Sequence, residues 1–560
     1  MSRADQTLKL PAMYDSLSES PGQGANFVPL TPIGFLSRTA DVYPDTTSLI
    51  YQSQRYTWSQ TEQRCQQLAH ALKRLGIGAH DTVSVLAFNT PETFEAHFFV
   101  PMAGAVLNTI NTRLDEETVR YILNFAEAKA VLVDRELLPL AIQGIRDRAE
   151  AGNPVPVILI DDPHAATQPE IPDDLSIYLY EELLNKPVKR SEYLPYQVAN
   201  ELQPLAINFT SGTSGNPKGV VYHHRGSYLM SMGTIAGWPL PLHPTYLYAV
   251  PLFHCNGWGH PWLMTMLGGT VVFTRTPAAD LILEAIRTHG VTHFGAAPIV
   301  LQMLIEAKSA SAPFDPAIRV MTAGAPPPPS ILEKTRAMGF DVIQPYGLTE
   351  TYGHISQCLW QEDWNDLTPA EQAELQAQQG IAFPMVEEVA VIDRASGAPV
   401  PRDGTTQGEI AIRGNTVMAG YYKDADATAA AFADGWFWSG DGAVVHDNAY
   451  IQIRDRLKDV IISGGENISS VEVEAVIYDH PAVLAAAVIA KPDPKWGEVP
   501  CAFVELVGGE TVDATALRAW CKEQLASYKV PGQFVFMPIP RTSTGKIQKF
   551  VLRAHAKKLA

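Results

Sequence analysis

At 560 residues with 46% hydrophobic content, the chain can bury a large core, and domains of about 100–200 residues imply that it has more than one. Its formal net charge of −18 repels nucleic-acid phosphates and anionic lipid, which excludes nucleic acid as a partner. Any polyphosphate ligand therefore needs a local basic pocket.

The cysteines and the N-terminal sequence indicate the cellular compartment of the protein. The five cysteines are odd in number and have no CxxC spacing, which indicates a reducing compartment and argues against disulfides or a structural zinc site. The N-terminus is polar, and apolar runs such as Val155–Ile160 are too short to span a bilayer. We therefore expect a cytoplasmic protein with no membrane insertion.

The first part of the chain alternates between helix and strand patterns. Trp58–Leu75 has helical periodicity and ends at Gly76, and Thr82–Phe88 reads as a buried strand. Short apolar runs at 129–134 and 155–161 follow further helical stretches. This alternation predicts parallel strands with crossover helices, an α/β architecture in which ligands bind beyond the carboxyl ends of the strands.

A glycine-rich loop, Thr210–Gly219, follows the apolar run Leu205–Phe209. Its glycines let backbone N–H groups turn toward one anion, its hydroxyls add donors, and its lysine adds positive charge. The spacing is close to that of a P-loop, but Pro217 replaces the last glycine and Gly219 stands where the Mg²⁺-binding Ser or Thr belongs. We interpret the segment as a different phosphate-binding loop; a mobile surface turn is the alternative. The candidate phosphate ligands are Thr210, Ser211, Gly212, Thr213, Ser214, Gly215 and Lys218.

Strand signals continue at 291–294, 319–323 and 341–343, after a helical stretch at 281–289. Two of the polar loops that follow carry candidate ligands. Thr322–Pro326 passes through Gly324 and Ala325 into a rigid proline run, either a flat backbone surface for a planar group or a stiff connector. Tyr346–Glu350 places an aromatic face, a hydroxyl and a carboxylate together, which can stack a base, donate to a phosphate and bind Mg²⁺.

The last third of the chain divides into three parts. The acidic, Gln-rich segment 362–379 is interpreted as a solvated helical insertion without a functional role. Segments 408–414 and 449–453 predict a small antiparallel unit that ends near Arg456. From Asp459 onward we expect a separate domain of about a hundred residues, with helices at 470–479 and 513–526 and strands at 485–490, 501–506 and 534–537.

Charged residues in this region suggest further chemistry. Asp441 and Arg456 suit the two hydroxyls of a ribose, although surface charges at a turn are the simpler reading. Lys546 follows Gly545 in a polar loop near the C-terminus. A lysine there can neutralise the charge that concentrates when a carboxylate attacks the α-phosphate of ATP.

Together these motifs resemble those of the acyl-adenylate-forming superfamily, which comprises acyl-CoA synthetases, peptide-synthetase adenylation domains and luciferases. The resemblance extends over essentially the whole chain. It implies a large N-terminal domain of stacked α/β subdomains with a small closing β unit (residues 1–457) and a small mobile α+β domain (458–560). It also implies that Tyr346 and Gly347 contact adenine, Thr349 the α-phosphate, Glu350 and Thr210 the metal, and Asp441 and Arg456 the ribose. Lys458 would be the hinge and Lys546 the catalytic lysine.

The segment Pro251–His260 corresponds to the acid-binding segment of that superfamily. It holds no carboxylate to pair with an ammonium, so an α-amino acid is an unlikely substrate. His254, Cys255 and His260 lie within seven residues without a second half-site, which disfavours zinc. Trp258 is large enough to close a tunnel, which favours a short- or medium-chain acid, including an aryl or methylthio acid. The predicted acyl site comprises His254, Asn256, Trp258, Gly259, Thr322 and Gly324. We also predict a catalytic role for His254.

The resemblance is nearest to short- and medium-chain acyl-CoA synthetases, 3-methylmercaptopropionate CoA ligases and plant acyl-activating enzymes. It implies two half-reactions that use ATP, Mg²⁺ and coenzyme A. The acid first forms an acyl-adenylate; the small domain then rotates and presents Ser463, Gly464 and Gly465 to CoA. The alternatives are a luciferase-like oxygenase and a non-catalytic nucleotide-sensing protein of the same fold. A homodimer is left open as the assembly state.

Overall fold

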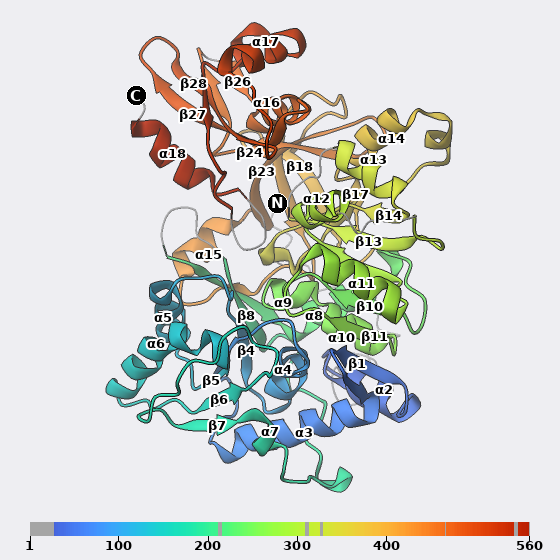
Figure 1. Cartoon of the computed structure of the whole chain (residues 1–560), viewed down its shortest axis with the longest axis vertical. Coiled ribbons are helices and arrows are strands. Elements are labelled where there is room, and N and C mark those ends of the chain that lie inside the picture. Colours follow the sequence, from blue (N-terminus) through green and yellow to red (C-terminus); the bar gives the residue numbers. More distant parts are fainter. Residues whose placement is uncertain are drawn as a thin grey trace, which may run out of the picture.

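The computed structural model describes residues 27–210, 216–307, 313–324, 329–464, 466–541 and 547–558. Figure 1 shows a large body that contains most of the chain and a smaller C-terminal unit, drawn in orange and red, at one end of it. The large body contains two main sheets, each mostly parallel. The predicted multidomain α/β fold is confirmed.

The first main sheet has eight strands in the order β21-β9-β8-β4-β3-β5-β6-β7. Strands from β8 to β7 run parallel, whereas β9 and β21 are antiparallel additions at one edge. The strands are β3 (Thr82–Leu86), β4 (Val106–Thr109), β5 (Ala130–Asp134), β6 (Val157–Ile160), β7 (Ile177–Leu179), β8 (Pro204–Thr210), β9 (Lys218–His223) and β21 (Gly420–Tyr421). Helices α5 (Glu116–Phe125) and α6 (Leu138–Glu150) share an apolar cluster with this sheet.

The second main sheet has seven strands in the order β14-β13-β12-β10-β11-β1-β2, and only the β1–β2 pair is antiparallel. Its strands are β1 (Thr47–Tyr51), β2 (Gln54–Thr57), β10 (Thr245–Tyr248), β11 (Thr270–Phe273), β12 (His293–Ala296), β13 (Ile318–Thr322) and β14 (Phe340–Ile343). Helices α11 (Ala279–His289), α12 (Pro298–Glu306) and α13 (Pro329–Ala337) accompany it, and apolar residues of α11 and α12 pack on the sheet.

The largest apolar cluster joins the two main sheets. It includes Leu107 of the first sheet, Val271 of the second, and Phe94 and Phe98 between them. The helices of this layer are α2 (Gly34–Val42), α3 (Trp58–Arg74), α4 (Pro91–Met102), α8 (His224–Gly237) and α10 (His260–Met266). Helix α3 begins with a capping box in which Thr57 accepts from the Gln60 N–H and the Gln60 side chain accepts from the Thr57 N–H.

Two smaller sheets close the large body. One consists of β15 (Pro345–Tyr346), β16 (Ser356–Gln357) and β17 (Ile381–Ala382). The other consists of β18 (Glu388–Asp393), β19 (Ala398–Pro399), β20 (Gly408–Arg413), β22 (Phe432–Ala433), β23 (Trp436–Val445) and β24 (Ile451–Arg456). The segment 362–379 is helical as predicted, with a 3-10 turn at Glu362–Asp366 and α14 at Pro369–Gln376. Short helical segments also lie at Arg135–Leu137, Tyr180–Leu183 (α7), Arg190–Glu192, Ala425–Ala431 (α15) and Ser527–Lys529.

The C-terminal unit is built on a five-stranded sheet of β25 (Ile461–Ser463), β26 (Glu466–Ile468), β27 (Val483–Asp493), β28 (Gly497–Leu506) and β29 (Gln533–Phe536). Alternate residues of β27 enter two apolar clusters. One cluster includes residues of α16 (Ser470–Tyr478) and α17 (Ala514–Gln524), and the other includes residues of α18 (Lys549–Lys558).

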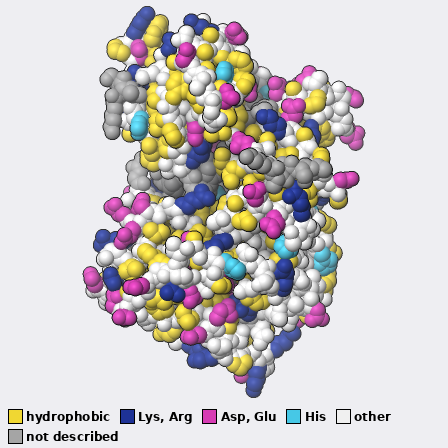
Figure 2. All heavy atoms as spheres, viewed as in Figure 1, with side chains coloured by type: hydrophobic (Ala, Val, Ile, Leu, Met, Phe, Trp, Pro, Cys, Tyr) yellow, Lys and Arg dark blue, Asp and Glu magenta, His cyan; other side chains and the backbone are white. Residues whose placement is uncertain are grey.

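Polar groups connect this unit to the sheet that ends at β24. The backbone N–H and the hydroxyl of Ser470 both donate to Asp455 Oδ2, at 2.6 Å each. The hydroxyl of Ser469 donates to the carbonyl of Arg454 at 2.6 Å. In Figure 2, Lys and Arg side chains also lie at the constriction between the large body and the C-terminal unit. Within the described ranges, no helix combines the length and apolar character that a bilayer-spanning segment needs.

Candidate active site

The predicted phosphate loop joins two antiparallel strands. Thr210, the last residue of β8, pairs with Lys218, the first residue of β9. The prediction that Lys218 and Gly219 are loop residues is wrong: both belong to β9, so the lysine is fixed by a strand ladder. Ser211, Gly212, Thr213, Ser214 and Gly215 lie outside the described residues.

Tyr421 connects Lys218 with Glu350. The ammonium of Lys218 lies 4.8 Å from the centre of the Tyr421 ring, and the Tyr421 hydroxyl donates to Glu350 Oε1 at 2.8 Å. Burial and then the Glu350 carboxylate raise the pKa of Tyr421, so its hydroxyl keeps its proton. Lys218 also lies 4.0 Å from Asp424 Oδ2. The lysine and the carboxylate thus contact the same tyrosine, one at its ring and the other at its hydroxyl.

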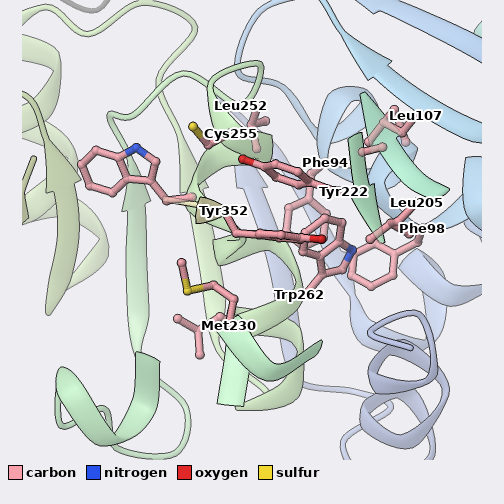
Figure 3. Packing of buried hydrophobic residues seen from close by; sticks show 14 of the residues in the cluster. Phe94, Phe98, Leu107, Leu205, Tyr222, Met230, Leu252, Cys255, Trp262 and Tyr352 are labelled. Atoms are coloured by element: carbon pink, nitrogen blue, oxygen red, sulfur yellow. The ribbon is translucent and has the colours of Figure 1, made fainter. Parts of the chain in front are cut away.

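Thr349 begins a 3-10 turn, Thr349–Thr351, and is held at two atoms. The Tyr222 hydroxyl donates to its carbonyl at 2.7 Å, and Cys255 Sγ lies 3.4 Å from its Oγ1. Figure 3 shows Cys255 beside the hydroxyl end of Tyr222, whose ring stacks on Tyr352 with centroids 4.0 Å apart. Burial alone would raise the pKa of Cys255, but His254, whose Nε2 is 3.9 Å from Sγ, and hydrogen bonds hold it below its usual value.

Asp441 binds two residues at once. Its Oδ2 accepts from the Tyr346 hydroxyl at 2.6 Å, and its Oδ1 lies 2.8 Å from Arg456 Nε. Asp441 and Arg456 are direct cross-strand partners on β23 and β24, so the sheet register itself brings them together. Burial is the largest single influence and opposes the charge of Arg456, but Asp441 and the other acidic groups near it together raise the pKa of the guanidinium. Tyr346, Asp441 and Arg456 therefore form one cluster.

The loop after β10 contains an unusual backbone conformation. Five consecutive residues have positive φ: Cys255 (48°), Asn256 (51°), Gly257 (59°), Trp258 (61°) and Gly259 (71°). A left-handed turn costs about 1–2 kcal/mol for each residue with a side chain, because Cβ crowds the carbonyl oxygen. Asn tolerates the conformation best among such residues, and Cys and Trp tolerate it poorly.

Buried contacts accompany this turn. The side chain of Asn256 is fully buried and its Oδ1 accepts from Asn208 Nδ2 at 2.8 Å. Trp258 is 6% exposed, and a Cβ on Gly295 would meet its ring at 3.0 Å. The ring of Trp258 lies edge-on to that of His260, which stacks on Trp238. Met230 and Trp238 are also buried, whereas Met232 is exposed.

Other predicted residues line the same strand ends. Thr322 ends β13, is fully buried, and its hydroxyl has no partner among the described residues. Gly324 has a φ of 97°. Gly347 packs on the Gly353 carbonyl so closely that any Cβ would lie 1.5 Å from that oxygen. Ala325 and Pro326 lie outside the described residues.

Of the predicted residues of the C-terminal domain, three are described. Lys458 lies between β24 and β25, strands of different sheets, and burial lowers its pKa. Ser463 ends β25, and Gly464 follows it with a φ of 60°, where a Cβ would meet the Trp496 ring at 2.8 Å. Gly465 and the predicted catalytic Lys546 lie outside the described residues.

Sequence reasoning missed Tyr222 and Tyr421, because their partners lie 127 and 71 residues away. The available signal was weak: Tyr421 follows Gly420 in a short segment between two predicted strands.

Comparisons with known proteins give matches over most of the chain. The profile of the AMP-binding enzyme family matches residues 36–422, and that of the AMP-binding enzyme C-terminal domain matches residues 472–546. The chain is 45% identical to the 2-methylpropanoate–CoA ligase CCL4 of Humulus lupulus over 542 residues, 95% of this chain and 96% of the relative. It is 44% identical to the peroxisomal acetate/butyrate–CoA ligase AAE7 of Arabidopsis thaliana, covering 98% of both chains.

A solved structure is similar over most of its length. It is the o-succinylbenzoate CoA synthetase MenE from Bacillus subtilis in complex with the acyl-adenylate intermediate OSB-AMP, with a TM-score of 0.77 and 26% identity over 93% of this chain and 97% of that chain. The same synthetase in complex with ATP and a magnesium ion has a TM-score of 0.76, with 26% identity over 93% and 99% of the two chains.

Proposed function

Since the chain belongs to the AMP-binding enzyme family and is an acid–thiol ligase, we propose that it joins a short-chain carboxylic acid to coenzyme A in the site described above. It uses ATP, Mg²⁺ and CoA and forms an acyl-adenylate, releasing AMP and pyrophosphate. One observation carries the assignment of the site: Lys218 and Glu350 both contact Tyr421, and Thr349 is next to Glu350 in the chain.

In the first half-reaction a carboxylate oxygen bonds to the α-phosphorus of ATP, and the bond from that phosphorus to pyrophosphate breaks. Lys218, the Thr349 hydroxyl and the loop from Thr210 to Gly215 bind phosphate oxygens. Glu350, with Thr210, would hold Mg²⁺, which supplies positive charge to the phosphates. Glu350 fits this role because Oε1 is oriented by Tyr421 and Oε2 has no partner among the described residues. Lys546 neutralises the two anions as they approach.

In this proposal the nucleoside of ATP binds at the cluster of Tyr346, Asp441 and Arg456. Asp441 and Arg456 bind the ribose, and the Tyr346 ring stacks on adenine beside Gly347 and the backbone of Gly324, Ala325 and Pro326. The bond between Tyr346 and Asp441 supports this, because it puts the aromatic face and the ribose acceptor next to each other.

In the second half-reaction the CoA sulfur bonds to the acyl carbon and AMP leaves. We propose that residues 458–560 rotate about Lys458 for this step, withdrawing Lys546 and presenting Ser463, Gly464 and Gly465 to CoA. The location of Lys458 between strands of two different sheets supports a hinge there.

The acid is proposed to lie against Trp258, Gly259, Thr322 and Gly324, with His254 at the reacting end. The buried rings of Trp258, His260 and Trp238 support a short pocket, because they are in mutual contact. The relatives named above are ligases for short acids. None of them favours the luciferase-like or nucleotide-sensing alternative.

The test is a panel of carboxylic acids graded in length from acetate upward, with branched, methylthio and aromatic members. The readout is AMP release that depends on ATP, CoA and the acid, together with direct detection of the thioester. We expect the highest kcat/KM among the short acids. A panel in which long-chain acids are the best substrates would refute the substrate proposal, and AMP release without thioester would refute the second half-reaction.

Cytoplasmic location and a homodimeric state are also part of the proposal. The cytoplasmic location rests on the reduced state of the cysteines, all five of which are free and buried. Subcellular fractionation of the source cells tests the location, and light scattering on the purified protein tests the assembly.

A further inference from the structure

The left-handed turn Cys255–Gly259 needs external support. Three of its five residues carry side chains, and a run of left-handed residues is not stable in an isolated chain. Such a conformation persists only where surrounding contacts determine it, and strained backbone of this kind clusters at functional sites. The contacts that hold the turn therefore determine where its side chains lie.

Asn256, the second residue of the turn, binds a residue of the first main sheet. Its Oδ1 accepts from Asn208 Nδ2 at 2.8 Å, and its backbone N–H donates to Asn208 Oδ1 at 3.2 Å. Asn208 is itself fixed by the sheet, because it pairs with Thr109 of β4 on one side and Val220 of β9 on the other. Asn208 lies on β8, two residues before Thr210, so this reciprocal pair fastens the turn next to the phosphate loop.

The two ends of the turn contact two different parts of the site. Cys255 Sγ lies 3.4 Å from Thr349 Oγ1, and the thiol donates to that oxygen. A hydroxyl that accepts from the thiol keeps its own proton for an outside acceptor, here a phosphate oxygen. Trp258, three residues on, packs on Gly295 and His260 on the acyl side.

We propose that Asn256 is a positioning residue: through the left-handed turn it holds Cys255 against Thr349 and Trp258 against Gly295, so one buried amide sets the phosphate side and the acyl side together. The inference rests on the proposed function, in which Thr349 binds phosphate. It changes the role predicted for Asn256 from a contact with the acid to the alignment of two other contacts.

The test uses two variants that break the same pair from opposite sides. Asn256→Gly keeps the left-handed backbone but removes the amide, and Asn208→Ala removes its partner. Gln52→Gly is the matched control, because Gln52 is also left-handed (φ 52°) but is exposed at the β1–β2 turn. Melting temperature is measured for all three, so that a folding defect is visible.

Steady-state kinetics give the first readout. Both pair variants should raise the KM for ATP and the KM for the acid together, by about tenfold each, while Gln52→Gly matches the wild type. The Nδ2 of Asn256 has no partner among the described residues, so a direct contact with the acid is the competing role. A rise in the KM for the acid alone would establish that role and overturn the inference, and so would unchanged values of both.

Alkylation of Cys255 gives a second readout that needs no ligase activity. Iodoacetamide labelling of the free protein is followed by peptide mass spectrometry at a pH above the ordinary thiol pKa, so that ionisation does not limit the rate. Labelling should be about tenfold faster in both pair variants than in the wild type, because Cys255, which is 3% exposed, becomes accessible when the turn loosens. Equal rates in all four proteins would refute the positioning role. If the wild type releases no AMP with any acid, the proposed function fails, while labelling still decides whether Asn256 holds the turn.

Discussion

The substitution Tyr421→Phe isolates one hydrogen bond at the centre of the site. It removes the hydroxyl that donates to Glu350 Oε1 at 2.8 Å and keeps the aromatic ring 4.8 Å from the Lys218 ammonium. A hydrogen bond to a charged group contributes about 1.5–3 kcal/mol. Since about 1.4 kcal/mol corresponds to a factor of ten, adenylation should slow about ten- to a hundredfold in kcat/KM.

The assay is pyrophosphate exchange at graded Mg²⁺ concentrations. Because the lost bond orients the proposed metal ligand, the Mg²⁺ concentration for half-maximal rate should rise in Tyr421→Phe. Tyr422→Phe is the control, because no contact to a site residue is described for the Tyr422 hydroxyl. If Tyr421→Phe and Tyr422→Phe give the same Mg²⁺ dependence and the same kcat/KM as the wild type, Glu350 is not oriented by Tyr421 for catalysis.

Four further predictions follow from other parts of the molecule. Lys546→Ala should abolish pyrophosphate release yet retain thioester formation from pre-made acyl-adenylate; equal loss of both would contradict the assigned role. Asp441→Asn should raise the KM for ATP, measured by AMP release, by about tenfold or more. The amide has one acceptor oxygen, so its N–H₂ group then faces the donor of either Tyr346 or Arg456. Trp258→Gly should shift the preference toward longer acids in the same panel, and an unchanged preference would remove Trp258 from the pocket. Burial lowers the pKa of His97 to about 4, so the unfolded chain takes up a proton below about pH 6.5 that the folded protein excludes. Stability is therefore lost as pH falls from about 6.5 to 4, by about 3 kcal/mol for this residue, and the melting temperature of His97→Gln should fall less steeply than that of the wild type.

Much of the fold follows from local patterns. The apolar run at 205–209 and the helical periodicity of Trp58–Leu75 correspond to β8 and α3 within one or two residues. These segments could be predicted because each is defined by neighbours along the chain. The antiparallel strand β9 could not, because its pairing with β8 depends on a turn whose glycines indicate only a loop.

The site was predictable where one short motif carries the chemistry, as in Tyr346–Glu350. It was not predictable where the decisive contact crosses the chain. Tyr421 reaches Glu350 only because β21 joins the edge of the first main sheet beside β9. The left-handed turn could not be predicted from the sequence either. Gly257 and Gly259 permit positive φ, but they do not indicate that Cys255 and Trp258 adopt it.

The contact between Ser470 and Asp455 has a consequence for movement of the C-terminal unit. Asp455 is 2% exposed and accepts two hydrogen bonds across the boundary between two sheets. When such a contact opens, each protein hydrogen bond is exchanged for one to water, so its net contribution is smaller than its strength in isolation. If the C-terminal unit rotates as proposed, water can take over the polar partners at this boundary.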